Sequence, residues 1–272
     1  MTIPLVVGVD GSEPSLEAVT WAAAEAARHG LPLHLLHAAT GEQEASAVIR
    51  DARARAEAAA PTVRSSSEVS QSDAASALVG KGRNAFALVL GYRGHGGLAG
   101  MLLGSVGLAV AAHADCPVIV VRGTPEHRDA RFGTVVVGVE DGEGSGSAVE
   151  FALREAHVRR CRLVAVHAGG APSGGRAAPR STPGFMETRR RPPAQVLDDA
   201  LRLPLRRYPD TTVNRLSMEK PGRPALLEAA STADLLVVGA RRRLGHPGLQ
   251  LGLVNHALLH HSPCPVAVVP QL

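Results

Sequence analysis

The chain of 272 residues contains a long internal repeat. Residues 6–38 match residues 136–168 at 14 of 33 positions when the sequence is offset by 130. Residues 86–121 match residues 234–269 at 16 of 36 positions at an offset of 148. Unrelated segments would agree at only a few positions, so the two halves indicate two copies of one folding unit.

The two copies differ in length by an insert in the second. The offsets of 130 and 148 differ by 18, so the second copy carries about that many additional residues. The segment over about residues 169–194 is rich in Gly, Pro and Arg, and such a composition cannot bury enough apolar area to order itself. It is interpreted either as a mobile surface loop or as a docking or regulatory segment. We predict one domain over residues 1–127 and a second over residues 128–272.

Each copy is written as alternating β-strands and α-helices. In the first copy the pattern predicts strands at residues 4–9, 31–38, 63–69, 86–91 and 116–122, with helices at about 12–29, 42–60, 74–81 and 105–114. The chain is 45% hydrophobic with only one Trp, two Tyr and four Phe, so Ala, Val and Leu must build the core. Parallel strands covered on both faces by helices have this composition. We therefore predict an α/β fold of two tandem, doubly wound parallel-sheet domains with right-handed crossovers.

Composition also excludes several classes of protein. The net charge of +4 comes from Arg, which clusters at residues 176–191 and 241–243, too locally for a nucleic-acid-binding face. No run of 18 apolar residues and no basic leader are present, so neither a membrane span nor secretion is expected, and the cytoplasm is the predicted location. The three cysteines lack metal-ligand spacing and are interpreted as buried small hydrophobes.

A glycine-rich stretch follows the fourth predicted strand. Residues 91–105, GYRGHGGLAGMLLGS, contain six glycines. In an open parallel sheet, ligands bind beyond the carboxyl ends of the strands, and glycine allows the backbone to approach a ligand closely. Successive amides can form an anion-binding nest, and Ser105 stands at the predicted start of a helix, whose free N–H groups favour anions. The stretch is therefore either a phosphate cradle or a long turn.

The spacing of these glycines matches a family motif. Gly91, Gly94, Gly104 and Ser105 fit G-x2-G-x9-G-(S/T), and the chain resembles the universal stress protein family, whose ATP-binding members carry that motif. The resemblance covers nearly the whole chain and implies two Rossmann-like domains in tandem. It implies ATP contacts in the first domain from Gly8, Asp10, His37, Ala38, Gly91, Arg93, Gly94, His95, Gly96, Gly97, Gly104, Ser105 and Val106.

Within this set two residues have an alternative interpretation. Asp10 ends the first strand, where its carboxylate can accept hydrogen bonds from a ribose hydroxyl or an adenine amino group. It can equally start the turn at Asp10-Gly11-Ser12 and cap the next helix. His95 can contact phosphate or remain exposed to solvent.

The second copy departs from the motif. Arg242 replaces the second motif glycine, Leu253 replaces the Ser or Thr, and Glu140 stands where the first copy has Asp10. Leu253 weakens a phosphate site, whereas neighbouring guanidinium groups can hold phosphates instead. The candidate residues of this second site are Gly138, Glu140, Gly239, Arg241, Arg242, Arg243, Gly252 and Leu253.

The sequence carries few signs of catalysis. No nucleophile elbow, P-loop or metalloprotease signature occurs, and no metal site is predicted, although His256 and His260 share a helical face. Phosphoryl transfer needs metal ligands and a positioned base, and only Ser105 and Asp10 stand near the loop. We predict an ATP-binding stress or dormancy regulator without efficient catalysis, binding ATP alone or with Mg²⁺. The alternatives are a slow ATPase or adenylate-transferring enzyme, and a nucleotide-free dimeric scaffold.

The expected partners follow from the same resemblance. Its domains commonly pair through the last strand, so residues 116–121 and 264–269 are expected to lie side by side, which would cover two exposed sheet edges. A homodimer of the whole chain and an unidentified protein partner are also expected, whereas nucleic acid and membranes are not.

Overall fold

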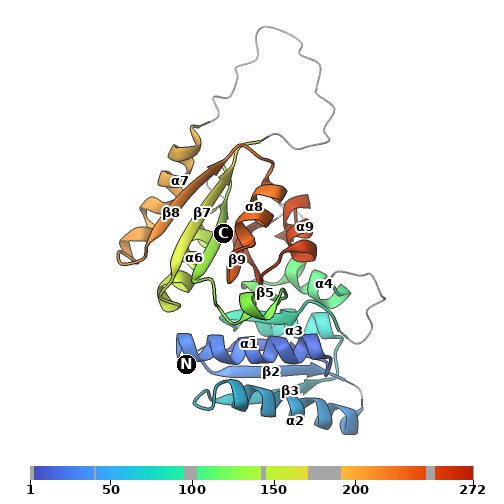
Figure 1. Ribbon diagram of the computed structural model, residues 1–272. Coiled ribbons are helices and arrows are strands. Elements are labelled where there is room, and N and C mark those ends of the chain that lie inside the picture. Colours follow the sequence, from blue (N-terminus) through green and yellow to red (C-terminus); the bar gives the residue numbers. More distant parts are fainter. Residues whose placement is uncertain are drawn as a thin grey trace, which may run out of the picture.

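A computed structural model of the chain describes residues 3–39, 41–94, 103–141, 145–170, 191–242 and 249–271. Strands and helices alternate through both halves, with the first half in blue to green and the second in yellow to red (Figure 1). The elements of the first half are β1 (Leu5–Val9), α1 (Glu13–His29), β2 (Leu33–Ala38), α2 (Glu42–Ala59), β3 (Ser65–Ser70), α3 (Ala74–Gly82), β4 (Ala87–Gly91), α4 (Ser105–His113), β5 (Val118–Val121) and the single turn α5 (Pro125–Arg128).

The second half repeats this order with a few additions. Its elements are β6 (Thr134–Val139), α6 (Gly146–Val158), β7 (Arg162–Ala168), α7 (Pro193–Arg202), the 3-10 turn η2 (Pro204–Arg206), β8 (Val213–Met218), α8 (Gly222–Ala230), β9 (Leu235–Arg242), β10 (Leu249–Gln250), α9 (Leu253–His261) and β11 (Val266–Gln271). The predicted strands and helices of the first half are confirmed to within a few residues. The short elements α5 and β10 were not predicted, because neither has a periodic apolar pattern long enough to recognise.

All the strands on the main path join one continuous sheet. Their order is β3-β2-β1-β4-β5-β11-β9-β6-β7-β8, and β10 pairs with β9. The pairs within each half of this path are parallel, as the doubly wound fold predicts, whereas β5 and β11 meet antiparallel. Ile119 lies opposite Ala267, its counterpart in the repeat, so an approximate two-fold axis passes through that pair.

Helices cover both faces of this sheet. The buried side chains of α1, α2, α6 and α7 form one continuous cluster with alternate strand residues from both halves. Those of α3, α4, α8 and α9 form the second cluster on the opposite face. Val, Leu and Ala make up most of both clusters, as the composition predicts. The two domains therefore share a core as well as a sheet.

Local sequence signals set the ends of α1. The Ser12 side chain caps its first turn by accepting a hydrogen bond from Ser15 N at 3.4 Å, and Pro14 stands in the first turn, where it is tolerated. Gly30 ends the helix at φ 64°, a left-handed conformation that glycine adopts readily. The helix therefore runs without interruption from the end of β1 to the middle of the molecule.

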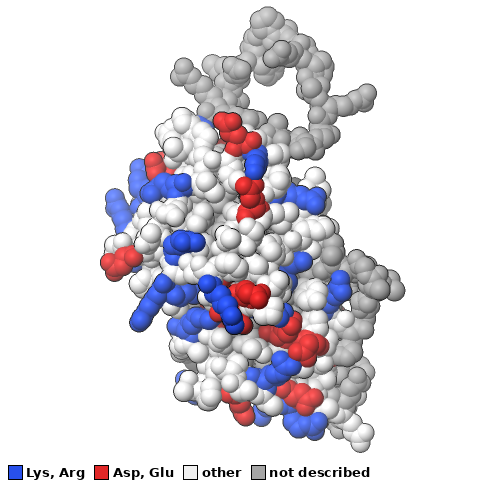
Figure 2. Space-filling model, in the orientation of Figure 1, with Lys and Arg blue, Asp and Glu red and all other residues white. Residues whose placement is uncertain are grey.

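Several predictions concern the remaining residues. Cys116 and Cys264 are buried as predicted, but Cys161 is only half-buried because it follows α6 at the end of a turn. The predicted insert at residues 169–194 falls largely outside the described residues, and the predicted domain boundary after residue 127 falls within α5. In the part of the chain that the structure describes, no helix combines the length and apolar character that crossing a membrane requires. On the face drawn in Figure 2, basic and acidic side chains are interspersed.

Candidate functional site

A cavity lies at the carboxyl ends of β1 and β4 in the first domain. Its volume is about 490 Å³. Backbone from the end of β4 and from the start of α4 lies on one side, and the start of α1 and of α3 on the other. The lining residues are Gly8, Val9, Asp10, Ser15, Leu36, Ala38, Ala74, Ala77, Leu78, Leu90, Gly91, Arg93, Gly94, Gly104, Ser105, Val106 and Gly107.

Two of the predicted motif glycines are required by close contacts. A Cβ on Gly94 would lie 2.1 Å from Asp10 Oδ2, and one on Gly91 would lie 2.5 Å from the carbonyl oxygen of Pro14. Both distances are well inside van der Waals contact, so a Cβ at residue 91 would collide with the backbone of α1 and one at residue 94 would displace the Asp10 carboxylate. The base of the loop is closed by a hydrogen bond of 3.0 Å from Gly104 N to Tyr92 O.

Asp10 takes part in both of the arrangements considered from sequence. Its Oδ1 accepts hydrogen bonds from Ser12 N at 3.0 Å and Ser12 Oγ at 2.6 Å, so the carboxylate holds the turn after β1. The helix cap itself is supplied by Ser12. The other oxygen, Oδ2, faces Gly94 at the cavity wall. The turn therefore fixes the orientation of the carboxylate.

The start of α4 forms the wall that suits an anion. Gly104 is the N-cap, and no described side chain caps the helix by a hydrogen bond. Ser105, Val106 and Gly107, which form the first turn, all line the cavity. A helix N-terminus presents N–H groups and the positive end of its dipole, so this wall favours negative charge.

Arg93 adds a cation to the same cavity. Its guanidinium carbon lies 5.4 Å from the centre of the Tyr92 ring, a cation–π distance that limits its movement. Its Nε is buried and has no hydrogen-bond partner among the described residues. A guanidinium at the mouth of an anion-binding wall can hold phosphate oxygens by charge-assisted hydrogen bonds.

Part of the lining is apolar, and this part was only partly predicted. Leu36, Leu78 and Leu90 are buried side chains that form it, together with Ala74 and Ala77 of α3. Such a surface suits a planar, weakly polar group. The helix at residues 74–81 was predicted, but its apolar face looks like that of any core helix, so its place in the site carried no sequence signal.

The structure brings most of the predicted site residues together, and the exceptions are few. His37 stands apart from the lining residues: its side chain is buried, and its Nδ1 hydrogen-bonds with Val9 O at 2.7 Å. His95, Gly96 and Gly97 lie outside the described residues. Ser15 and Gly107 line the cavity but were not predicted.

A smaller cavity of about 270 Å³ occupies the equivalent place in the second domain. The predicted residues Gly138, Glu140, Gly239 and Arg241 line it, whereas Gly252 and Leu253 do not. Its other lining residues are Val139, Asp141, Ser145, Val166, His167, Ala168, Gly222, Leu226, Val238, Val254 and Asn255.

Three features make this second cavity less suited to an anion than the first. Arg241 Nη2 lies 3.3 Å from Glu140 Oε2, so the arginine already has an anionic partner. Asn255, which replaces the first domain's Gly107, donates a hydrogen bond of 2.8 Å from Nδ2 to Gly239 O. Leu253 is 92% exposed and supplies no hydroxyl group at the start of α9. The Arg242 side chain and Arg243 lie outside what the structure describes.

Fold and cavities together define a tandem α/β protein of two doubly wound domains, with a glycine-lined site at the strand ends of the first. The profile of the universal stress protein family matches residues 1–48, 38–122 and 131–270. The chain therefore belongs to the universal stress protein family, as two of its domains in tandem.

Individual relatives agree with this assignment. The universal stress protein Rv1996 of Mycobacterium tuberculosis is 33% identical over 303 aligned residues, covering 98% of this chain and 95% of the relative. Rv2623 of the same organism is 29% identical, covering 99% and 97%. Among solved structures, a universal stress protein from Archaeoglobus fulgidus superimposes with a TM-score of 0.71 at 18% identity, covering 98% of both chains.

Proposed function

We propose that the first domain of this universal stress protein binds ATP in the cavity at the ends of β1 and β4, and that occupancy regulates a surface read by another protein. The observation that carries the proposal is the approach of Gly94 to Asp10, which brings the loop after β4 against a carboxylate at the end of β1. A ligand in this cavity meets backbone N–H groups on one wall and a carboxylate and apolar side chains on another.

Each wall suits one part of the nucleotide. The loop after β4 and the first turn of α4, with Gly104 and Ser105, suit the phosphates because N–H groups and the helix dipole favour anions. Arg93 adds a positive charge there. Asp10 suits a ribose hydroxyl or an adenine amino group as a hydrogen-bond acceptor. The apolar side chains of β2, α3 and β4 suit the base.

Mg²⁺ fits this site as a companion of the nucleotide. The described lining offers two hydroxyls, Ser15 and Ser105, and one carboxylate, Asp10. Ser15 Oγ already donates a hydrogen bond to Ser12 O at 2.9 Å, and Asp10 Oδ1 is already held by Ser12. Mg²⁺ commonly retains several waters and binds through one or two protein oxygens together with phosphates. The ion would therefore neutralise phosphate charge.

The described residues around the cavity favour binding over turnover. Phosphoryl transfer needs a residue that positions the attacking water, and the described lining has one carboxylate, which is fixed by its turn. We therefore propose a regulator whose signal is the bound nucleotide. The protein partner and the pairing of chains into a homodimer belong to the same proposal.

The test compares one substitution at equivalent positions of the two domains. A Cβ at Gly104 has its nearest neighbour 4.0 Å away, and one at Gly252 has none within 4 Å, so both positions accept a side chain without unfolding. Gly104→Glu places a negative charge at the phosphate wall and should abolish ATP binding measured by calorimetry. Gly252→Glu is the matched control and should leave binding to the first domain unchanged.

Other outcomes separate the alternatives. Unchanged ATP affinity in Gly104→Glu would show that the site is assigned wrongly. Steady release of ADP or AMP by the wild-type protein would favour the enzyme alternative. The absence of binding at millimolar ATP would favour a nucleotide-free scaffold.

A further inference from the structure

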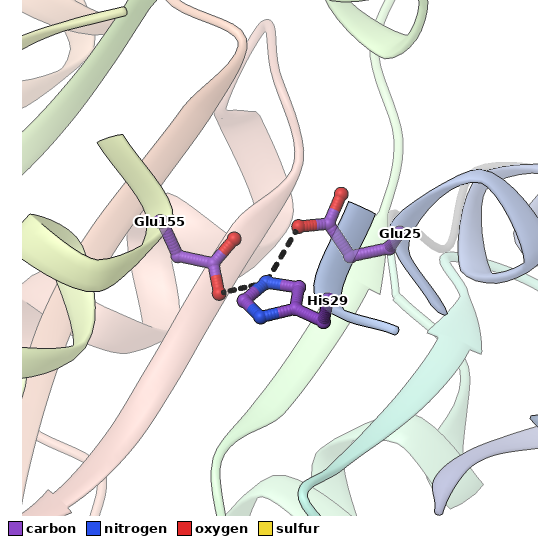
Figure 3. Close-up of side chains that lie close together, drawn as sticks. All are labelled: Glu25, His29 and Glu155. Atoms are coloured by element: carbon purple, nitrogen blue, oxygen red, sulfur yellow. Dashed lines mark ion pairs between the residues drawn. The ribbon is translucent and has the colours of Figure 1, made fainter. Parts of the chain in front are cut away.

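A buried ionic cluster joins the two domains far from both cavities. Glu25 and His29 lie on the last turns of α1, and Glu155 lies on the last turn of α6 (Figure 3). Arg159 is the C-cap residue of α6. The side chains of all four are 6% exposed or less. Glu25 and Glu155 are equivalent positions of the repeat, and so are His29 and Arg159. The approximate two-fold axis that relates the domains therefore brings equivalent positions of the two copies together.

Each domain supplies a cation for the other domain's carboxylate. Arg159 Nη2 lies 2.7 Å from Glu25 Oε2, and its Nε lies 3.4 Å from Glu155 Oε2. His29 Nε2 lies 3.1 Å from Glu155 Oε1 and 3.3 Å from Glu25 Oε1, so it stands between the two carboxylates (Figure 3). Arg159 thus bridges the Oε2 atoms and His29 bridges the Oε1 atoms.

Among the described charged groups around the cluster, His29 is the one that bridges the Oε1 atoms of Glu25 and Glu155. Arg28 also contacts Glu25 Oε2, at 2.7 Å, but is 30% exposed, so water screens much of its charge. The Arg154 guanidinium lies over the Phe86 ring at 4.4 Å, and Phe86 packs on His29. Cys161 and Tyr208 are the other titratable groups that act on this cluster from the second domain.

The charge balance of the buried groups depends on His29. With both carboxylates ionised, Glu25, Glu155 and Arg159 carry one net negative charge, and a protonated His29 brings the four buried groups to zero. Burial and the neighbouring Glu25 raise the pKa of Glu155, whereas its contact with His29 favours the ionised form. Buried charge is tolerated when it is paired, and removing one partner of a buried ion pair is strongly destabilising. Two carboxylates that approach across an interface also repel one another unless a cation lies between them.

We propose that the His29 imidazolium is a proton-dependent clasp between the two domains: it holds Glu25 and Glu155 together, and loss of its proton loosens the pairing of β5 with β11. Burial alone would lower the pKa of His29, but contacts with Glu155 and Glu25 raise it from 6.5 to about 9. The folded chain then holds this proton roughly 300-fold more tightly than the unfolded chain.

The sign of the pH dependence follows from that increase. A group whose pKa is higher in the folded state stabilises the fold fully below its unfolded pKa. The stabilisation by His29 is therefore complete below about pH 6.5 and is lost as pH rises through about 9. Where the pairing of β5 with β11 loosens, the two strands present sheet edges, which can pair with another chain.

A metal ion is the competing interpretation, because Glu25, His29 and Glu155 each bring one ligand atom within 4.8 Å of the others. The arginines argue against it. Both Oε2 atoms are already held by guanidinium groups, and a divalent ion replacing one proton would leave an excess of buried positive charge beside Arg159.

The direct test is an NMR titration of the imidazole groups in the wild-type protein, with His29 assigned by its absence in His29→Gln. We expect His29 to titrate near pH 9 and to titrate at lower pH in Glu155→Gln. Titration of His29 near pH 6.5 in the wild type would overturn the proposal.

Urea unfolding between pH 7 and pH 10 supplies the thermodynamic test. The folded-to-unfolded ratio of wild type relative to His29→Gln should fall by roughly 70-fold over this range. Adding Glu155→Gln to His29→Gln restores a balanced Glu25–Arg159 pair, so the double variant should be more stable than His29→Gln alone. A ratio that does not change with pH, or a double variant of lower stability, would contradict the clasp.

Two further measurements locate the effect. At pH 7, hydrogen exchange in His29→Gln should accelerate at β5 and β11 more than at β1, which serves as the internal control. Acceleration confined to α1 would mean that His29 only supports its own helix. Stabilisation of the wild type but not of His29→Gln by added Zn²⁺ or Mn²⁺ would instead assign the cluster as a metal site and overturn the proposal.

Discussion

Replacing Gly94 with Ala tests the geometry on which the nucleotide site depends. The new Cβ would lie 2.1 Å from Asp10 Oδ2, against about 3.5 Å for ordinary contact, so the carboxylate must move by about 1.4 Å. Asp10 Oδ1 is held by two hydrogen bonds from Ser12. The movement therefore disrupts the turn after β1 and takes the carboxylate away from the ligand.

The expected magnitude follows from the hydrogen bond that this movement breaks. A hydrogen bond to a charged group contributes about 1.5–3 kcal/mol. Loss of one such bond between Asp10 and the nucleotide predicts ATP affinity roughly 10- to 150-fold weaker in Gly94→Ala. Isothermal titration calorimetry at 25 °C measures this change. Gly80→Ala is the control, because a Cβ on that α3 glycine meets nothing within 4 Å, and its affinity should match the wild type.

A double variant shows whether Asp10 is the cause. In an Asp10→Ala background the carboxylate is gone, so adding Gly94→Ala should weaken binding no further, and the two changes should be strongly non-additive. Equal losses from Gly94→Ala in both backgrounds would refute the reasoning. The loop would then act on the nucleotide through its own backbone, independently of the end of β1.

Two other predictions concern stability and reactivity. Asp234, 1% exposed, accepts hydrogen bonds from Phe132 N at 2.9 Å and Thr134 N at 3.0 Å, so Asp234→Ala leaves two amide groups without their acceptor. Urea unfolding should show a loss of about 2–5 kcal/mol, and a loss below 1 kcal/mol would contradict this role. Burial raises the pKa of Cys264 to about 12 and that of Cys116 to about 11, so both thiols stay protonated at pH 8. Mass spectrometry after iodoacetamide treatment should find them unmodified in the folded protein and alkylated in urea; rapid labelling of the folded protein would disprove the prediction.

Much of the fold could be predicted because its signals are local and repeated. Alternating apolar strands and capped helices appear in both copies, and each copy supports the interpretation of the other. A start of α1 near Ser12 or Ser15 was predicted in this way, and the cap is Ser12. The pairing of β5 with β11 was predicted from the family resemblance and is confirmed. The short turn α5 has no such signal, because its four residues complete a single turn.

The candidate site likewise contains residues that the sequence predicted and residues that it did not. Gly91, Gly94 and Ser105, which line the first cavity, were predicted because their spacing resembles a family motif. The apolar wall from α3 could not be assigned to the site, because Ala74 and Ala77 follow the same pattern as any buried helical face. Such a wall becomes part of a site only through tertiary packing.

The buried ionic cluster was not predicted for a different reason, although the repeat contains a sign of it. Glu25 and Glu155 are matched acidic residues within otherwise apolar helical stripes, and a buried acidic residue needs a partner. The partner stands in the other domain, so it becomes visible only when β5 and β11 are paired. Matched charged residues on the apolar stripes of an internal repeat are therefore a signal for contact between its copies.

The repeat also explains why the two cavities differ while the interface keeps its symmetry. A cavity is formed within one domain, so Ser105 can be matched by Leu253 without any effect on the other site. An interface about a two-fold axis uses the same surface of both domains at once, so a change in either copy unbalances the same cluster. Trp21 lies 5.4 Å from the Arg159 guanidinium, and its repeat equivalent Phe151 lies on the same interface beside Phe86. Physical coupling therefore acts on both copies at the interface, whereas each cavity is formed within its own domain.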